Sequence, residues 1–137
     1  MPEIINKKYF VLAAFFRSYW MSGVVVLIIF GVSVYPFSPD TNLPKFQYSD
    51  KLIHLLMYAS LAFILFYEYY KDKHLKSCFR SFYIVLLLFP VIFGGVIEIL
   101  QQAFFPPRTA EWLDWVSDIV GSLIGFLAAK MIFKDRA

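Results

Sequence analysis

The sequence predicts an all-α, polytopic membrane protein: a four-transmembrane-helix bundle with both termini in the cytoplasm. Hydrophobic residues make up 60% of the 137 positions and charged residues only 17%, which is far from the composition of a soluble domain. Four apolar runs are each long enough to cross about 30 Å of hydrocarbon at roughly 1.5 Å per residue. Lysines and arginines also gather in alternate connections between these runs.

The four predicted spans lie near residues 20–37, 52–70, 82–105 and 112–133. The connections between them are short, so we expect a single domain over residues 1–137 with no separate soluble module. Lys7, Lys8 and Arg17 precede the first run, as basic residues precede the apolar core of a signal peptide. That run ends in Tyr-Pro-Phe-Ser-Pro without a small-residue cleavage site, so we expect a retained span that acts as an apolar brace.

The basic residues indicate which way round the bundle sits. The following share one predicted side of the membrane: Lys7, Lys8, Arg17, Lys71, Lys73, Lys76, Arg80, Lys130, Lys134 and Arg136. The two connections on the other side carry Lys45, Lys51 and Arg108. Because Lys and Arg are in excess on the cytoplasmic side of membrane proteins, both termini and the middle connection are predicted to be cytoplasmic. No alternation of basic and aromatic residues indicates a nucleic-acid partner.

Polar side chains gather at the predicted outer ends of the last three spans. The members of this candidate polar pocket are Asp50, Lys51, His54, Tyr58, Glu98, Gln101, Gln102, Arg108, Asp114 and Asp118. Spacings of four place Asp50 with His54 on one helix face, and Asp114 with Asp118 on another. A charged group deep in the bilayer costs about 2.5 to 3.5 kcal/mol on insertion scales. We therefore expect these faces to turn inward and meet.

Small residues form a track along the last span. Its members are Ser117, Gly121, Gly125 and Ala129. Such a track lets two helices approach closely, either within the bundle or between two copies in a homo-oligomer. In the third span, Pro90 with Gly94 and Gly95 predicts a kink or loosening, which serves helix fit or widens the outer half of the bundle.

One ordered set of motifs points to a known family. It consists of Asp50-Lys51-x-x-His54-x-x-x-Tyr58, Glu98-x-x-Gln101, Arg108, Asp114 and Gly121-x-x-x-Gly125. In this order and spacing the residues resemble the VanZ-like membrane proteins, over most of the chain after the first span. The resemblance implies a small integral protein of the bacterial cytoplasmic membrane, with a link to reduced susceptibility to the glycopeptide teicoplanin. Asp118 departs from the pattern, since the family often has Asn there.

Two interpretations of the polar residues involve no catalysis. They can form a buried network of ion pairs and hydrogen bonds that only fixes helix packing. Alternatively, the pocket recognises the headgroup of an outer-leaflet membrane lipid or a lipid-linked cell-wall precursor. In that case Lys51 and Arg108 meet a phosphate, while carboxylates orient hydroxyls or amines.

A third interpretation is an intramembrane enzyme. His54 with Glu98, or the pair of Asp114 and Asp118, then acts as general acid and base on a lipid headgroup. No nucleophile motif accompanies these residues, so the catalytic residues stay unassigned. His54 and the three carboxylates also offer donors for zinc or a harder divalent ion, but they come from three separate spans. The spacing indicates no metal site, and we expect no cofactor.

Overall fold

The computed structural model describes residues 15–35, 48–71, 82–105 and 111–133. These ranges form four helices and contain no strand. The helices are α2 (Trp20–Val34), α3 (Ser49–Lys71), α5 (Phe82–Phe104) and α6 (Trp112–Phe133). The all-α prediction is therefore confirmed for the described part of the chain, and α5 continues through Pro90 without a break.

Three of the helices are long and apolar enough to cross a membrane, namely α3, α5 and α6, with 23, 22 and 22 residues in their apolar stretches. At about 1.5 Å per residue each exceeds the roughly 30 Å of a hydrocarbon core. The first predicted span corresponds to α2, which is apolar but has 15 residues. A helix of that length covers only about 22 Å, so the structure shows three helices of spanning length.

The bundle buries polar residues beside an apolar core and is apolar on its outside. The polar residues that it buries are Ser22, Ser33, His54, Glu68, Glu98, Gln101, Asp114, Asp118 and Ser122. Its outward-facing positions carry large apolar side chains such as Leu27, Ile99 and Met131. In water this arrangement would expose a hydrophobic surface around the whole bundle, whereas in lipid it is the expected one. The pattern of burial agrees with a membrane protein.

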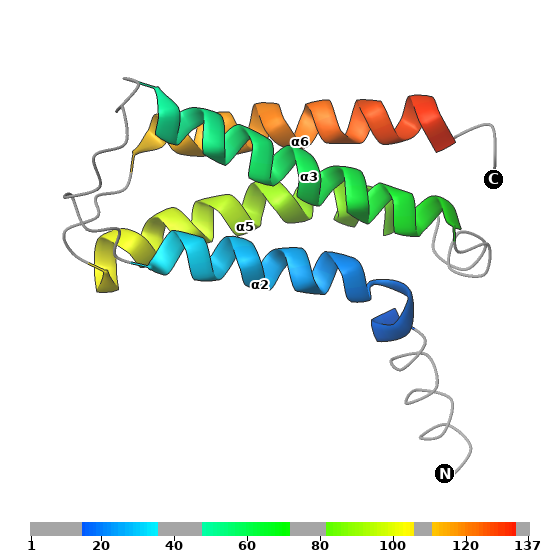
Figure 1. Cartoon of the computed structure of the whole chain (residues 1–137), viewed down its shortest axis with the longest axis horizontal. Coiled ribbons are helices and arrows are strands. Elements are labelled where there is room, and N and C mark those ends of the chain that lie inside the picture. The colour runs from blue at the N-terminus through cyan, green and yellow to red at the C-terminus, as the bar shows by residue number, and fades with distance from the viewer. Residues whose placement is uncertain (1–14, 36–47, 72–81, 106–110, 134–137) are drawn as a thin grey trace, which may run out of the picture.

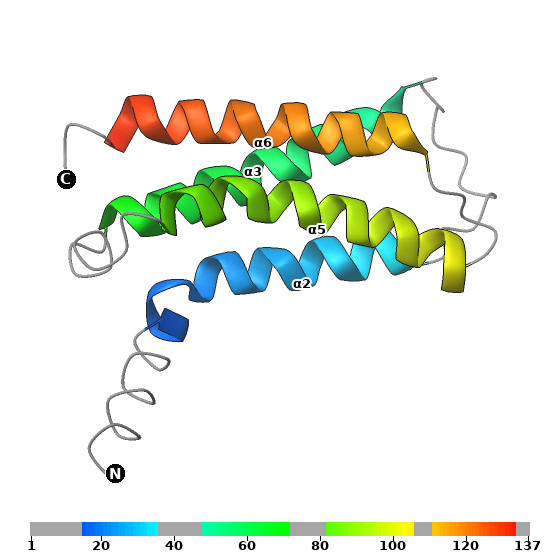
Figure 2. The same cartoon turned by 180° about the vertical axis from the view of Figure 1, so that it is seen from behind.

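The four helices lie side by side and alternate in direction (Figures 1 and 2). At one end of the bundle, here named the polar end, α2 and α5 finish while α3 and α6 begin (Figure 1). The other end, here named the capping end, holds the start of α2 and the last turns of α3. Among these helices, α3 packs most extensively against α6.

Glycines allow the close contact between α3 and α6. A Cβ built on Gly121 would lie 2.2 Å from the carbonyl oxygen of Leu55, and one on Gly125 would lie 2.1 Å from that of Ala59. Neither position has room for any side chain, because the obstacle is backbone rather than a movable side chain. Ala129, one turn further along the small-residue track, is fully buried. The track is thus occupied by α3 of the same chain.

Side chains from other helices satisfy both ends of α2. At the capping end, Glu68 of α3 accepts hydrogen bonds from the backbone nitrogens of Met21, at 2.9 Å, and Ser22, at 3.2 Å. The Ser22 hydroxyl donates to the same carboxylate. At the polar end, the amide nitrogen of Gln101 donates to the carbonyl oxygen of Ser33 at 2.8 Å. These bonds serve backbone groups that a helix terminus leaves without partners.

Candidate functional site

The first turns of α3 and α6 meet the last turns of α5 at the polar end. There the structure brings together Asp50, Lys51, His54, Tyr58, Glu98, Glu111, Asp114 and Asp118, which we call the polar cluster. Helical spacing explains the arrangement, because Asp114 and Asp118 share a face of α6, as do His54 and Tyr58 on α3. The close α3–α6 packing then presses these two faces against each other.

The outer part of the cluster is an ion-pair network around Lys51. Its ammonium nitrogen lies 2.7 Å from Glu111 Oε2 and 3.0 Å from Asp114 Oδ1. The Asp114 side chain is buried, Lys51 is partly exposed, and Glu111 is 52% exposed. A lysine ammonium has three donors, and these two bonds use two of them. The network therefore neutralises the buried Asp114 and still presents charged groups at the surface.

The inner part consists of His54, Glu98 and Asp118. His54 Nδ1 lies 3.0 Å from Asp118 Oδ1, with only 5% and 1% of the two side chains exposed. Glu98 Oε2 accepts a hydrogen bond of 3.0 Å from the backbone nitrogen of Glu111. That bond ties the last turns of α5 to the start of α6. Three helices thus each contribute one buried ionisable group to the same spot.

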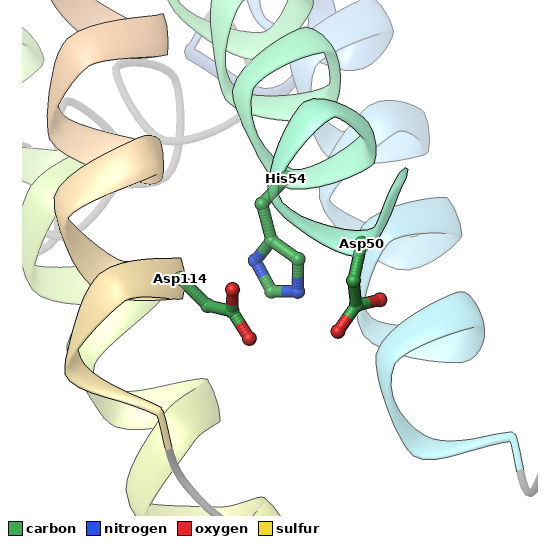
Figure 3. A group of neighbouring side chains, drawn as sticks. All are labelled: Asp50, His54 and Asp114. Atoms are coloured by element: carbon green, nitrogen blue, oxygen red, sulfur yellow. The ribbon is translucent and has the colours of Figure 1, made fainter. Parts of the chain in front are cut away.

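His54 stands between two pairs of carboxylates. One pair is Asp50 and Asp114, and Figure 3 shows the imidazole ring between them. The other pair is Glu98 and Asp118. In each group of three, one ligating atom from every residue lies within 4.8 Å of the others. A histidine so placed can relay a proton, donate to a carboxylate or share a cation with its neighbours.

Within the described residues, three buried oxygen atoms of the cluster have no hydrogen-bond partner. They are the Tyr58 hydroxyl, Glu98 Oε1 and Asp118 Oδ2. Most buried polar atoms in folded proteins are paired, so such a group of open acceptors indicates a missing partner. Gly94 leaves room for one of them, because a Cβ built there would lie 2.6 Å from Asp118 Oδ2.

The remaining predicted site residues either lie outside the polar cluster or are not among the described residues. Gln101 is buried, but its amide nitrogen is bound to Ser33 at the end of α2. Gln102 is exposed. Arg108 lies outside the described residues. The small-residue track lies behind the cluster, where Gly121 and Gly125 face α3 while the Ser117 hydroxyl donates to Leu113 of its own helix.

Two carboxylates that matter in the structure are absent from the sequence-based set. Glu111 pairs with Lys51 and orients Glu98 through its backbone nitrogen. The sequence feature that could have identified Glu111 is its position as a charged residue directly before the last apolar run. Glu68 lies inside an apolar run, two residues before its end, and this position alone marks it as a buried charge in need of donors.

No protein-family model, curated protein or solved structure matches the chain.

Proposed function

We propose that the chain is a VanZ-like integral protein of a bacterial cytoplasmic membrane and that it recognises the headgroup of an outer-leaflet lipid. Lipid-linked cell-wall precursors are the favoured class, because their headgroups combine phosphates with sugar hydroxyls. The proposal includes the fourth span near residues 20–37, cytoplasmic termini, and a polar end that faces outward. Recognition of such a precursor would also account for the link to glycopeptide susceptibility that the resemblance implies.

The observation that carries this proposal is the composition of the outer part of the polar cluster. Within the described residues Lys51 bonds to Glu111 and Asp114, which leaves one of its three ammonium donors to suit a phosphate oxygen. The exposed carboxylates of Asp50 and Glu111 suit hydroxyls or amines. The apolar surface around the bundle supports an approach along the bilayer, with the cluster at the level of the headgroups.

Native mass spectrometry of the protein in a mild detergent tests the proposal. We expect wild-type protein to retain an anionic lipid and Lys51→Ala to retain about tenfold less, because one charge-assisted hydrogen bond is lost. Glu111→Gln changes an exposed member of the cluster without leaving a buried charge, and should also weaken retention. Lys130→Ala is the control, since it removes a lysine in the last turn of α6, at the opposite end of that helix from the polar cluster. Equal retention in all four proteins would exclude the polar cluster as the lipid-binding site.

Labelling from outside intact cells tests the orientation. A cysteine introduced at Thr41 should react with an impermeant thiol reagent, whereas the native Cys78 should not. The two positions belong to connections on opposite predicted sides of the membrane. The reverse pattern would place the polar end in the cytoplasm and rule out an outer-leaflet ligand.

A further inference from the structure

We propose that His54, Glu98 and Asp118 bind a divalent first-row transition-metal ion, with Zn²⁺ the best fit. Their spacing along the sequence does not indicate a metal site, since the three residues come from α3, α5 and α6. The folded chain brings one ligating atom of each within 4.8 Å of the others. Ligands about 2.0 to 2.2 Å from a zinc ion lie roughly 3.3 to 3.6 Å apart. Small side-chain rotations therefore suffice to close the site around an ion.

The open oxygens are the second observation that points to a ligand. Among the residues that the structure describes, Glu98 Oε1 and Asp118 Oδ2 find no hydrogen-bond partner, although the two residues are only 6% and 1% exposed. No donor of the described residues reaches these two acceptors, and buried acceptors of this kind are normally paired. The Tyr58 hydroxyl is also buried and without a partner among the described residues. A cation between the carboxylates would coordinate Glu98 Oε1 and Asp118 Oδ2 at once. The Tyr58 hydroxyl would then remain nearby as a neutral oxygen.

The balance of charge also favours a divalent ion. Lys51 contacts Glu111 and Asp114, and among the residues that the structure describes no lysine or arginine forms an ion pair with Glu98 or Asp118. Two ionised carboxylates beside a neutral imidazole would leave two negative charges in a medium of low dielectric constant, which is costly. One divalent ion compensates both charges.

The donor set narrows the choice of metal. One imidazole nitrogen with two carboxylates suits zinc, manganese or iron, whereas thiolate-seeking copper(I) finds no sulfur ligand here. Calcium and magnesium prefer ligand sets made of oxygen alone. The carboxylates of Asp50 and Asp114 on either side of the ring fit the same assignment (Figure 3). Metal-bound imidazoles almost always donate their remaining N–H to such a group.

We prefer the inner ligand set of His54, Glu98 and Asp118 to the outer ligand set of Asp50, His54 and Asp114. Asp114 already forms an ion pair with Lys51, and Asp50 is exposed. A metal there would have to compete with an ammonium group and with water, while the inner carboxylates have free lone pairs.

The test measures metal binding directly and needs no lipid. Full-length protein in detergent is stripped with a chelator, checked for helix content by circular dichroism, and titrated with Zn²⁺ by calorimetry and with Co²⁺ by absorption. We expect about one ion per chain in the wild type, with Glu98→Gln and Asp118→Asn weakening the affinity about 100-fold or more. Glu68→Gln removes a buried carboxylate at the capping end and should bind like the wild type.

Three results would overturn the proposal. They are a wild-type protein that binds neither ion, unchanged binding in both Glu98→Gln and Asp118→Asn, and binding that is lost in Asp50→Asn but kept in those two variants. If a variant fails to fold, the wild-type titration and the Co²⁺ spectrum still decide, because histidine and carboxylate ligation shifts the cobalt bands from those of the aqueous ion. The inference is separable from the proposed function, since lipid retention can be measured on the chelator-stripped protein.

Discussion

The two ends of the bundle bury carboxylates in opposite ways. At the capping end, both oxygens of Glu68 accept hydrogen bonds from the first turn of α2. At the polar end, Glu98 and Asp118 each keep one oxygen without a partner in the part of the chain that the structure describes. The fold therefore accounts fully for the first carboxylate and only partly for the other two. A buried carboxylate with both oxygens paired needs no further partner, whereas the open oxygens at the polar end are the basis of the proposed metal site.

The largest effect should come from filling the contact that builds the polar end. Gly121→Val places a side chain where even a Cβ would meet the Leu55 carbonyl oxygen at 2.2 Å, so α3 and α6 must separate. We expect a loss of about 3 kcal/mol or more in the free energy of unfolding, measured by titration with a denaturing detergent. Gly31→Ala is the control, because a Cβ there meets no atom within 4 Å in the described part of the chain. It should be neutral or stabilising by up to about 1 kcal/mol.

Two isosteric substitutions, one at each end of the bundle, compare the two ends most directly. Glu68→Gln replaces one acceptor oxygen by an NH₂ group facing the donors of Met21 and Ser22. It should lower the free energy of unfolding by about 2 kcal/mol, the scale of a lost helix cap with charged hydrogen bonds. Thermal unfolding in detergent measures it.

Glu98→Gln should behave differently in the metal-free protein. Its amide keeps an oxygen for the Glu111 backbone nitrogen and offers NH₂ donors to the open Asp118 oxygen, while it removes a buried charge. The free energy of unfolding should stay equal to that of the wild type or rise. Equal destabilisation by the two amide substitutions would remove the distinction between the ends.

The sequence predicts much of this arrangement, and the remainder has identifiable causes. Period-four spacing and the cost of charge in lipid predict that the faces carrying His54 and Asp118 turn inward and meet, and in the structure these two side chains are in contact. Neither rule says which partner each carboxylate finds, because that depends on helix rotation and depth. The caps of α2 are therefore unpredictable from local sequence, since Glu68 lies 46 residues along the chain from Ser22. Pattern alone also does not separate Gln101, which is bound to α2, from Gln102, which is exposed.

An intermediate effect is expected from Gly94→Ala. The new methyl group would lie 2.6 Å from Asp118 Oδ2, so the carboxylate must move away from α5. Alanine favours a helix over glycine by about 1 kcal/mol, which offsets part of the strain. We expect little change in the free energy of unfolding and about tenfold weaker Co²⁺ binding, the scale of a displaced neighbour of a metal ligand. An unchanged Co²⁺ affinity would mean that the position of Asp118 does not matter to the ion.

The smallest effect belongs to the link between α5 and the end of α2. Gln101→Leu removes the donor to the Ser33 carbonyl oxygen while it keeps the volume of the side chain. One neutral hydrogen bond contributes about 1 kcal/mol, and the carbonyl oxygen is left without this donor, so the unfolding free energy should fall by about that amount. Gln102→Leu is the matched control on the same helix, because its side chain is exposed and should cost nothing measurable. Metal binding should be unchanged in both variants, since neither glutamine belongs to the polar cluster. If Gln101→Leu instead abolished lipid retention without lowering stability, Gln101 would take part in headgroup recognition rather than in the support of α2.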